Sequence, residues 1–436
     1  MRFGPGKRTF KRLGIGAALI VGVLLVVNAF MSWRVETRFQ AKVEAIRAEG
    51  DPASIAELKP EPIPADENAA AYMDKLEPRL NGFSKEYAAF YNSELGKAYD
   101  ELDEGEPATA DQLAAMRSLL DKYLDLEEMI AMAAAAPHYA STADFTLGFQ
   151  KFLEVQSPRL TRVRNAARMA DWRTEVLVAD GRREEAVRRG IQLLQLAKLH
   201  EAEPSLISFL VSVSVRSVAI HGIHRALDAG PVSTEVHEEL ERELARQDEP
   251  ASIEKALRLE RAISVSASRE QAWEVAPAWW IGLVGWPMKG QFIAPLDFYE
   301  QVLPMADLPW PEIQMKFAKG GVLSAPTGHG VLADLLLPAF EAAILASHRD
   351  TAMIRSLRIF NALQLFAEVN GREATELTEI ELPKDAMSDP FSGKPLIAIH
   401  TDDGWLVYSV MENGVDDGGD FDDLKDRGLR PRKRTE

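Results

Sequence analysis

Residues 389–423 read DPFSGKPLIAIHTDDGWLVYSVMENGVDDGGDFDD, and this stretch decides the fold of the C-terminal part of the chain. Residues 396–400 and 405–410 are rich in β-branched and aromatic side chains, a composition typical of strands. Between them, TDDG at 401–404 is a turn sequence whose glycine tolerates a positive φ. The stretch therefore predicts a β-hairpin followed by an acidic, glycine-rich loop.

That loop is a candidate ion site, because five aspartates and three glycines crowd its end. Crowded carboxylates repel one another without a cation, and Ca²⁺ prefers about six to eight oxygen ligands from a flexible loop. The candidate ligands are Asn413, Asp416, Asp417, Asp420, Asp422 and Asp423. Their spacing does not match an EF-hand. Two interpretations stay open: a calcium loop that stiffens the fold, and a solvated acidic turn whose glycines permit tight bends.

The residues before the hairpin predict a helix that completes a small α+β module. Helical periodicity returns at Leu332 and is strongest over Ala342–Val369, and Asn370-Gly371 is a good helix end. We therefore expect a module over 342–423, with a basic tail at 424–436. The tail is either a solvated terminus or a contact for anionic lipid headgroups or an acidic polymer.

The order of these elements resembles the globular part of the major pseudopilins of type II secretion systems. The motifs that carry the resemblance are a helix ending SLRIFNALQLFAEVNGR, then ELTEIEL, DPFSGKPL and LVYSVMENGVDDGG. In those pseudopilins a similar turn leads to strands and to a loop that holds calcium with backbone carbonyls and acidic side chains. The resemblance thus implies a pseudopilin-like fold and a calcium loop here.

Two positions depart from the pseudopilin pattern. Asn413 stands where an acidic residue is common, and Met411 stands where glycine is common, so the path of the loop is open to question. In pseudopilins the membrane helix also runs directly into the module, whereas here about 300 residues intervene. The chain as a whole is similar to uncharacterised membrane-anchored envelope proteins of bacteria.

The N-terminus predicts a membrane anchor. A basic segment, 1–12, precedes an uncharged apolar run over 13–33, which as a helix would be roughly 30 Å long and match a bilayer core. The positive-inside rule places residues 1–12 in the bacterial cytoplasm and the rest outside, in a single pass. A cleaved signal peptide ending at VNA, residues 27–29, is the alternative. Both interpretations export the remainder of the chain.

A helix and a proline-rich stalk are expected over 34–65, because Pro60, Pro62 and Pro64 favour a stiff extended chain. We expect this stalk to hold the body away from the membrane. From 66 to 341 the pattern predicts a mainly helical domain built as a bundle or stack of helical hairpins. Its clearest helices are expected at 160–179, 183–201, 205–228, 233–246 and 252–274.

One hairpin, ADWRTEVLVADGRREEAVRRGIQLLQLA, is similar to a tetratricopeptide unit, although no repeated period accompanies it. The helical domain therefore offers a surface for protein partners. Near 276–311, four tryptophans and six prolines interrupt the helical pattern. This segment is either an irregular loop packed over the helices or an aromatic segment that contacts a membrane or a partner.

Composition excludes several classes of function. The net charge of −17 argues against a nucleic-acid partner, and the absence of cysteine removes disulfides, thiol catalysis and thiolate metal sites. The sequence holds no recognisable catalytic motif, and the pair His221 and His224 has no acidic third ligand nearby. We expect an extracytoplasmic scaffold or interaction protein. The alternatives are a component of a secretion or pilus-like apparatus and an envelope hydrolase with a site in the helical domain.

Overall fold

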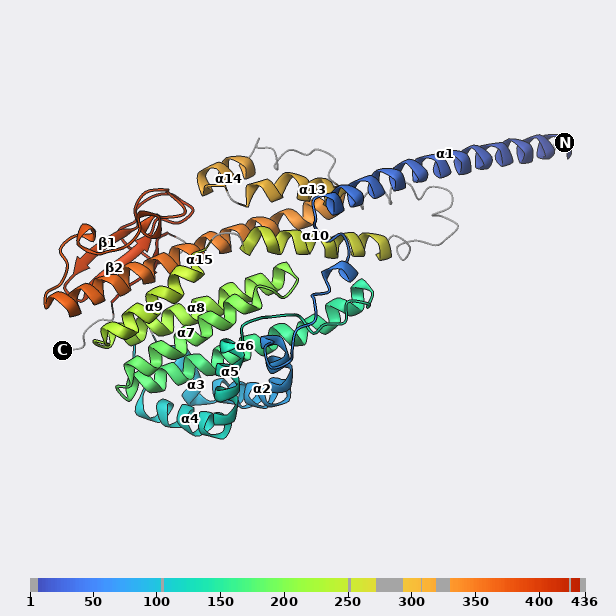
Figure 1. The fold of residues 1–436 in the computed structure, drawn as a ribbon. Helices are drawn as coiled ribbons and strands as arrows, with labels where there is room; N and C mark the ends of the chain where they lie inside the picture. Colours follow the sequence, from blue (N-terminus) through green and yellow to red (C-terminus); the bar gives the residue numbers. More distant parts are fainter. Residues whose placement is uncertain are drawn as a thin grey trace, which may run out of the picture.

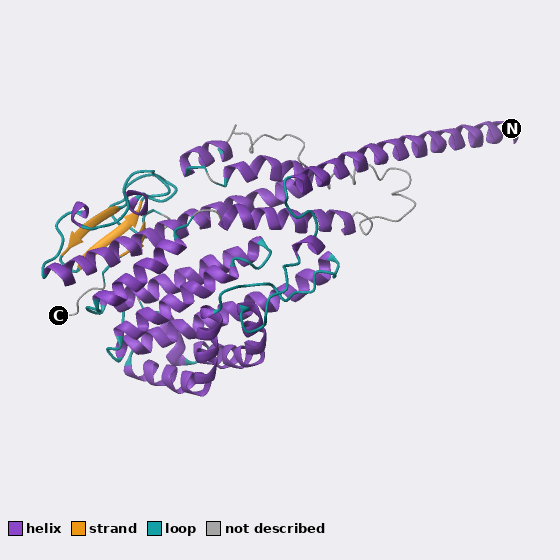
Figure 2. Ribbon diagram, viewed as in Figure 1, coloured by secondary structure: helices purple, strands orange, loops and turns teal. Residues whose placement is uncertain are grey.

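The computed structural model describes residues 7–102, 106–249, 252–271, 293–306, 308–318, 330–422 and 425–431. The described chain is mainly helical and carries one small three-stranded sheet (Figures 1 and 2). This confirms the predicted fold class at that level. The sheet lies at the end of the molecule opposite the N-terminal helix (Figure 1).

The body is a stack of antiparallel helices whose order along the chain follows the predicted hairpins. Its helices are α2 (Ala69–Tyr91), α3 (Glu94–Asp100), α4 (Ala110–Leu120), α5 (Leu124–Ala135), α6 (Phe149–Ala179), α7 (Arg183–His200), α8 (Leu206–Asp228), α9 (Thr234–Gln247) and α10 (Ser252–Gln271). Short 3₁₀ turns lie at Ile55–Leu58 and Asp121–Tyr123. The five helices expected between 160 and 274 are therefore confirmed, and α6 begins earlier than expected.

The α6–α7 hairpin shows why these sequences form tight pairs. Gly181 has φ +74°, and the amides of Gly181 and Arg182 donate to the carbonyls of Val178 and Leu177, which closes the last turn of α6. Further along, α7 lies close to α8 at Gly190, where a side chain would collide with Ile223. Gly181 in the turn and Gly190 at the contact with α8 thus allow these helices to pack closely.

The main core includes side chains of α2 and α6, and Trp172 of α6 is its largest fully buried side chain. The rings of Phe83 and Phe90 meet the Trp172 ring edge to face at 6.4 and 4.8 Å. Aliphatic side chains of α7, α8 and α9 continue this core. Burying a ring of this size stabilises the fold by roughly 1.5–3 kcal/mol.

Two described helices are long and apolar enough to cross a membrane, α1 (Lys7–Ala48) and α8. More than half of the apolar window of α8 is buried between α6, α7 and α15, as in the core helix of a soluble domain. Side chains of α1 from Ile15 to Trp33 are instead largely exposed. Of the two, only α1 presents the apolar surface that a bilayer would cover.

The second half of α1 packs against the body. Phe39, Val43 and Ile46 recur at helical spacing and are buried against side chains of α10 and of α13 (Ala294–Val302). Ion pairs border this contact: Lys42 Nζ lies 2.8 Å from an Asp297 carboxylate oxygen. Burial of three such apolar side chains stabilises the contact by roughly 5–9 kcal/mol as an upper estimate.

The residues after α1 run along the body, which differs from the expected free-standing stalk. Ile55 and Leu58 are buried against Phe152 and Ile263, and the Ile55 amide donates to Ser266 Oγ at 2.9 Å. The prolines at 60, 62 and 64 still keep the chain out of a helix. An extended segment with apolar side chains can pack against a neighbouring helix or separate a domain from the membrane. The prolines predict an extended chain in both cases and do not distinguish them.

Part of the tryptophan- and proline-rich segment is helical, contrary to the irregular structure expected over 276–311. The helices are α13 and α14 (Trp310–Phe317), joined by a 3₁₀ turn at Leu303–Met305. Prolines lie in the first turn of both helices, a position where their missing N–H costs nothing. Trp279, Trp280 and Trp286 lie outside the described residues.

The helix α15 (Gly330–Asn370) joins the body to the C-terminal sheet. It ends at Asn370-Gly371 as predicted, with φ +65° at Gly371. Strands β1 (Ile397–Thr401) and β2 (Gly404–Ser409) form the expected hairpin, in which Thr401 pairs with Gly404. Two 3₁₀ turns, Leu377–Glu379 and Lys384–Met387, connect α15 to the hairpin.

The third strand, β3 (Arg427–Leu429), lies in the region expected to be a basic tail. It pairs antiparallel with β2, and Leu429 is buried. Gly428 lies opposite Tyr408 and so close to β2 that a Cβ atom there would collide with the Val407 carbonyl. The module therefore extends beyond Asp422, the last described residue of the predicted acidic loop, and takes in the first residues of the tail.

Candidate functional site

The acidic loop leaves β2 at Met411 and returns at β3. Asp416 Oδ1 accepts hydrogen bonds from the Tyr408 hydroxyl at 2.8 Å and from the Gly418 amide at 2.9 Å. Burial and the Asp416 carboxylate raise the pKa of the Tyr408 hydroxyl. Asp416 is thus held at one position by Tyr408 of β2 and by the backbone of the loop.

The other predicted ligands are engaged in local turns. Asn413 donates to Asp417 Oδ2 at 2.8 Å and accepts from the Val415 amide at 2.9 Å. Asp420 accepts from Lys425 Nζ at 2.5 Å, and this ammonium group lowers the pKa of the Asp420 carboxyl. Asp422 is exposed, and Asp423 lies outside the described residues.

These carboxylates do not converge on one point. Across the described ranges, no three His, Asp or Glu side chains gather as a metal site. The loop as a whole therefore has the hydrogen-bond pattern of an acidic turn, and the calcium interpretation stays a prediction.

One further carboxylate, Asp426, was missed in the sequence and lies at the centre of this loop. It is 2% exposed, and its Oδ2 accepts from the amides of Asp417 at 3.0 Å and Gly419 at 2.8 Å. Its Oδ1 is buried with no hydrogen-bond partner among the described residues. Burial, and then the charges of Asp416 and Asp417, raise the pKa of the Asp426 carboxyl. No sequence signal marked Asp426, because it stands among basic residues.

A second buried carboxylate, Asp389, holds the DPFSG turn against β2. Its oxygens accept from Ser409 Oγ at 2.8 Å, from the Phe391 amide at 2.9 Å and from Ser392 Oγ at 3.0 Å. The Val410 amide adds a longer bond of 3.3 Å. Asp389 therefore ties the entry of the hairpin to its exit, and its role is structural.

A cleft lies where the body meets this turn, with a volume of about 700 Å³. Its charged walls are largely neutralised by ion pairs: Arg216 lies 2.7 Å from Asp350, and Arg355 donates to Asp248 at 2.9 Å. His348 packs between the rings of Trp310 and Phe391, and burial lowers its pKa. Arg216, Asp350, Arg355 and Asp248 thus join the walls of the cleft through ion pairs, and the hydrolase alternative stays a prediction.

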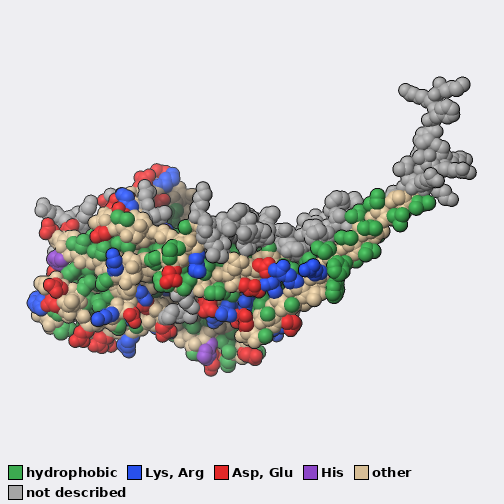
Figure 3. Space-filling view, turned by 90° about the horizontal axis from the view of Figure 1, so that it is seen from above, with side chains coloured by type: hydrophobic (Ala, Val, Ile, Leu, Met, Phe, Trp, Pro, Cys, Tyr) green, Lys and Arg blue, Asp and Glu red, His purple; other side chains and the backbone are tan. Residues whose placement is uncertain are grey.

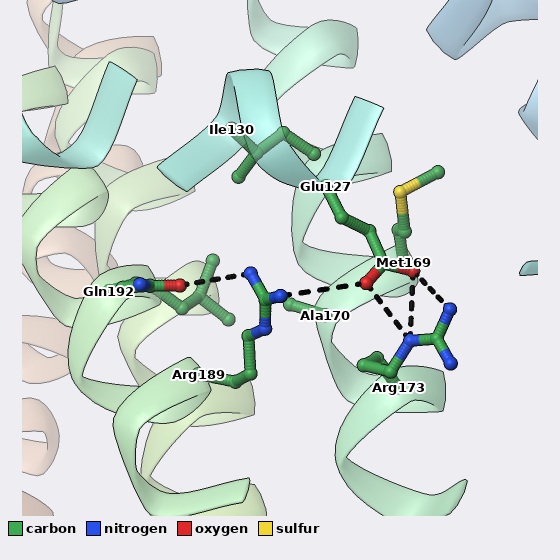
Figure 4. A pocket seen from close by; sticks show the side chains of 8 residues that line it. Glu127, Ile130, Met169, Ala170, Arg173, Arg189 and Gln192 are labelled. Atoms are coloured by element: carbon green, nitrogen blue, oxygen red, sulfur yellow. Dashed lines mark hydrogen bonds and ion pairs between the residues drawn. The ribbon is translucent and has the colours of Figure 1, made fainter. Parts of the chain in front are cut away.

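A smaller pocket lies between α5, α6 and α7, lined by the residues of Figure 4. Glu127 points into it and accepts from Arg173 Nε at 2.9 Å, while Arg189 approaches the same carboxylate at 3.8 Å (Figure 4). Its volume of about 20 Å³ holds no more than a water molecule. This group is a buried ion network that joins three helices.

The histidine pair on α8 is also structural. His221 Nδ1 lies 2.7 Å from the Ser217 carbonyl oxygen one turn earlier, and the His224 ring packs on Phe360 at 4.6 Å. These contacts come from different neighbours, and the pair belongs to no metal-binding group in the described part of the chain. Comparisons with known protein families, with curated proteins and with solved structures find no match to this chain.

Proposed function

We propose that this chain is a membrane-anchored extracytoplasmic scaffold or interaction protein of the bacterial envelope, with a single pass and its N-terminus inside. The observation that carries the proposal is the division of α1. Large apolar side chains between Ile15 and Trp33 are exposed, and the part from Phe39 to Ile46 packs on the body. A soluble protein rarely leaves so long an apolar surface uncovered.

The anchor and its orientation are tested together with cysteine probes, because the chain has no cysteine of its own. In intact spheroplasts, a membrane-impermeant maleimide should label Thr378→Cys on the module and leave Arg8→Cys unlabelled. The protein should stay in the membrane after carbonate extraction. Release into the soluble fraction with loss of an N-terminal tag would instead show a cleaved signal peptide.

We also propose that the C-terminal module is pseudopilin-like and is stiffened by calcium. The orphaned Asp426 Oδ1 supports this, because a cation beside it would satisfy a buried oxygen and offset the repulsion from Asp416 and Asp417. Binding would require the carboxylates of Asp416 and Asp417 to turn toward that of Asp426, because no three acidic side chains converge in the described part of the chain. Asp420 is excluded from this set, because Lys425 already neutralises it.

Millimolar calcium should raise the melting temperature of the module in the full chain by a few degrees, since an ion at about 100 times its Kd stabilises by about 2.7 kcal/mol. The shift should vanish in the double variant Asp416→Ala and Asp417→Ala, and should persist in the matched Asp422→Ala. An unchanged melting temperature in the wild-type chain would contradict the calcium proposal.

Membership of a secretion or pilus-like apparatus is a second candidate, and the position of the module bears on it. The sheet packs on α15 through Leu396 and Val407, far along the chain from α1. A partner would meet the module at the end opposite the anchor (Figure 1). Co-purification of secretion components with the wild-type chain, and their loss when residues 372–436 are deleted, would support this candidate.

A further inference from the structure

The body begins within one or two helical turns of the predicted membrane boundary. Helix α1 is continuous from Lys7 to Ala48, so no hinge separates its exposed apolar part from its docked part. Trp33 is 64% exposed and Phe39 is 7% exposed. Six residues separate them, which is about 9 Å along a helix.

That distance is close to the thickness of the lipid headgroup layer. The headgroup region of one leaflet is roughly 5–8 Å thick. If Trp33 marks the edge of the hydrocarbon core, Phe39 lies only a few ångströms beyond the headgroups. Side chains of the body that surround Phe39 must then lie at the membrane surface, unless α1 unwinds.

Three other helix ends gather at the level of Phe39. The Arg269 guanidinium at the end of α10 lies 5.7 Å from the Phe39 ring, and Glu270 beside it accepts the Phe149 amide that begins α6 at 2.7 Å. Near the start of α13, Asp297 pairs with Arg38 at 3.1 Å. The end of α10 and the starts of α6 and α13 thus form one end of the body, next to the base of the exposed part of α1 (Figure 1).

This end carries cations that suit phosphate headgroups. Arg34 is exposed, and the Arg38 side chain is 62% exposed even with its partner Asp297. Arg269 at the end of α10 is also exposed and adds further positive charge. Figure 3 shows lysine and arginine side chains gathered where α1 joins the body, on a chain whose net charge is −17.

We infer that this end of the body, formed by the start of α6, the end of α10 and the start of α13, rests on anionic lipid headgroups and holds the C-terminal module at a fixed height. The inference rests on the proposed membrane anchor. Phe340 of α15 contacts Phe298 of α13 at 5.6 Å, near the membrane end. From there α15 runs thirty residues to Asn370, about 45 Å, so the module stands at the far end.

The test measures energy transfer from a dye on the full chain to a labelled lipid, in vesicles of phosphatidylethanolamine and phosphatidylglycerol. The dye is placed on Lys151→Cys at the membrane end or on Lys394→Cys on the module, both at exposed positions. We expect transfer several-fold higher from position 151. Equal and weak transfer from both positions in vesicle-bound protein would overturn the inference, whereas protein that fails to float with the vesicles would overturn the anchor itself.

A flexible Gly-Ser insertion after Arg34 tests whether the continuous helix sets the height. With the insertion, transfer from position 151 should fall while flotation is unchanged. The same insertion after Gly371, beyond the end of α15, is the matched control and should leave transfer from position 151 as it was. Unchanged transfer after the Arg34 insertion would also overturn the inference.

Discussion

The helical body and the C-terminal module pack on opposite sides of the same helix, α15. Different interactions stabilise each of them. On one side of α15, Leu357 and Phe360 enter the large aliphatic and aromatic core, and Asp350 pairs with buried Arg216. On the other side, Ile359 and Leu363 meet a thin sheet. The body therefore owes its shape to many contacts, whereas the module depends on a few apolar side chains and on turns fixed by carboxylates.

This difference has a consequence for mutation. A core with many contacts keeps its fold when one contact is removed, unless the removal leaves a buried charge without a partner. A turn held by one carboxylate fails when that carboxylate is removed, and the damage stays local. The following predictions test this contrast, from the largest expected effect to the smallest.

The largest effect should come from breaking the buried ion group between α8 and α15. Asp350→Ala leaves Arg216, which is 2% exposed, with Glu201 as its one remaining partner among the described residues. Loss of one member of a buried pair costs about 3–5 kcal/mol. Urea unfolding of the detergent-solubilised chain, followed by circular dichroism, should show this loss across the whole body.

The matched control is the exposed pair Lys97 and Glu94 on α3. Glu94→Ala should cost less than about 1 kcal/mol, because solvent screens exposed charges. Equal losses in the two variants would mean that the Asp350 group does not join α15 to the body as described.

Acid should weaken the body before the module. His200 is fully buried, and burial lowers its pKa to about 4. The folded ring stays neutral while the unfolded chain takes up a proton near its ordinary pKa of about 6.5. The resulting stability is complete above pH 6.5 and is lost as pH falls toward 4, by up to about 3 kcal/mol.

In the module, Asp426 should contribute with the opposite sign, against the contribution of Asp420, whose pKa is lowered. The pKa of Asp426 is raised by burial, so the folded module binds a proton more readily than the unfolded chain and gains stability as pH falls through that value. Thermal unfolding from pH 7 to 4, followed by the helix signal for the body and by proteolytic cleavage for the module, measures both. His200→Gln should flatten the pH dependence of the body, and a slope that is unchanged in this variant would contradict the assignment.

A smaller and local effect is expected from Asp389→Ala. Four hydrogen bonds disappear, and the buried Ser409 hydroxyl and Phe391 amide lose their acceptor. Unsatisfied groups of this kind cost about 2 kcal/mol in total when solvent can partly reach them. Limited proteolysis should cleave the module early while α6 to α9 stay protected; simultaneous loss of protection in both regions would contradict the contrast drawn here.

The sequence predicted much of the body because its signals are local. Gly181 and Gly230-Pro231 disfavour the continuation of a helix through local backbone effects alone. The predicted limits of α7 and α8 therefore agree with the structure to within a residue. The hairpin followed from the same kind of signal, since Thr401 pairs with Gly404 across the predicted turn.

The remaining features depend on contacts between distant segments. The strand β3 contains only arginine, glycine and leucine, and its pairing with β2 brings Gly428 so close to the Val407 carbonyl that a larger residue would collide there. The pairing of β3 with β2 also places Asp426 inside the acidic loop, where its carboxylate accepts from the Gly419 amide. The docking of α1 did leave a signal, Phe39, Val43 and Ile46 at helical spacing, which was masked by the prolines that follow.

The smallest change in stability is expected at Met411, where the prediction concerns which of two variants is the more stable. This residue has φ +51°, in the left-handed region that a residue with a side chain adopts at a cost. Its side chain is 1% exposed and packs in the cluster that contains Phe391, so burial offsets the backbone strain. Both Met411→Gly and Met411→Ala lose that burial.

Only Met411→Gly also relieves the strain. It should therefore be more stable than Met411→Ala by about 1 kcal/mol, the reverse of the usual order at exposed or helical positions. Melting temperatures of the two variants, measured in the same full chain, make the comparison independent of the lost packing. If the alanine variant were the more stable, Met411 would not hold a left-handed conformation, and the loop would leave β2 by another path.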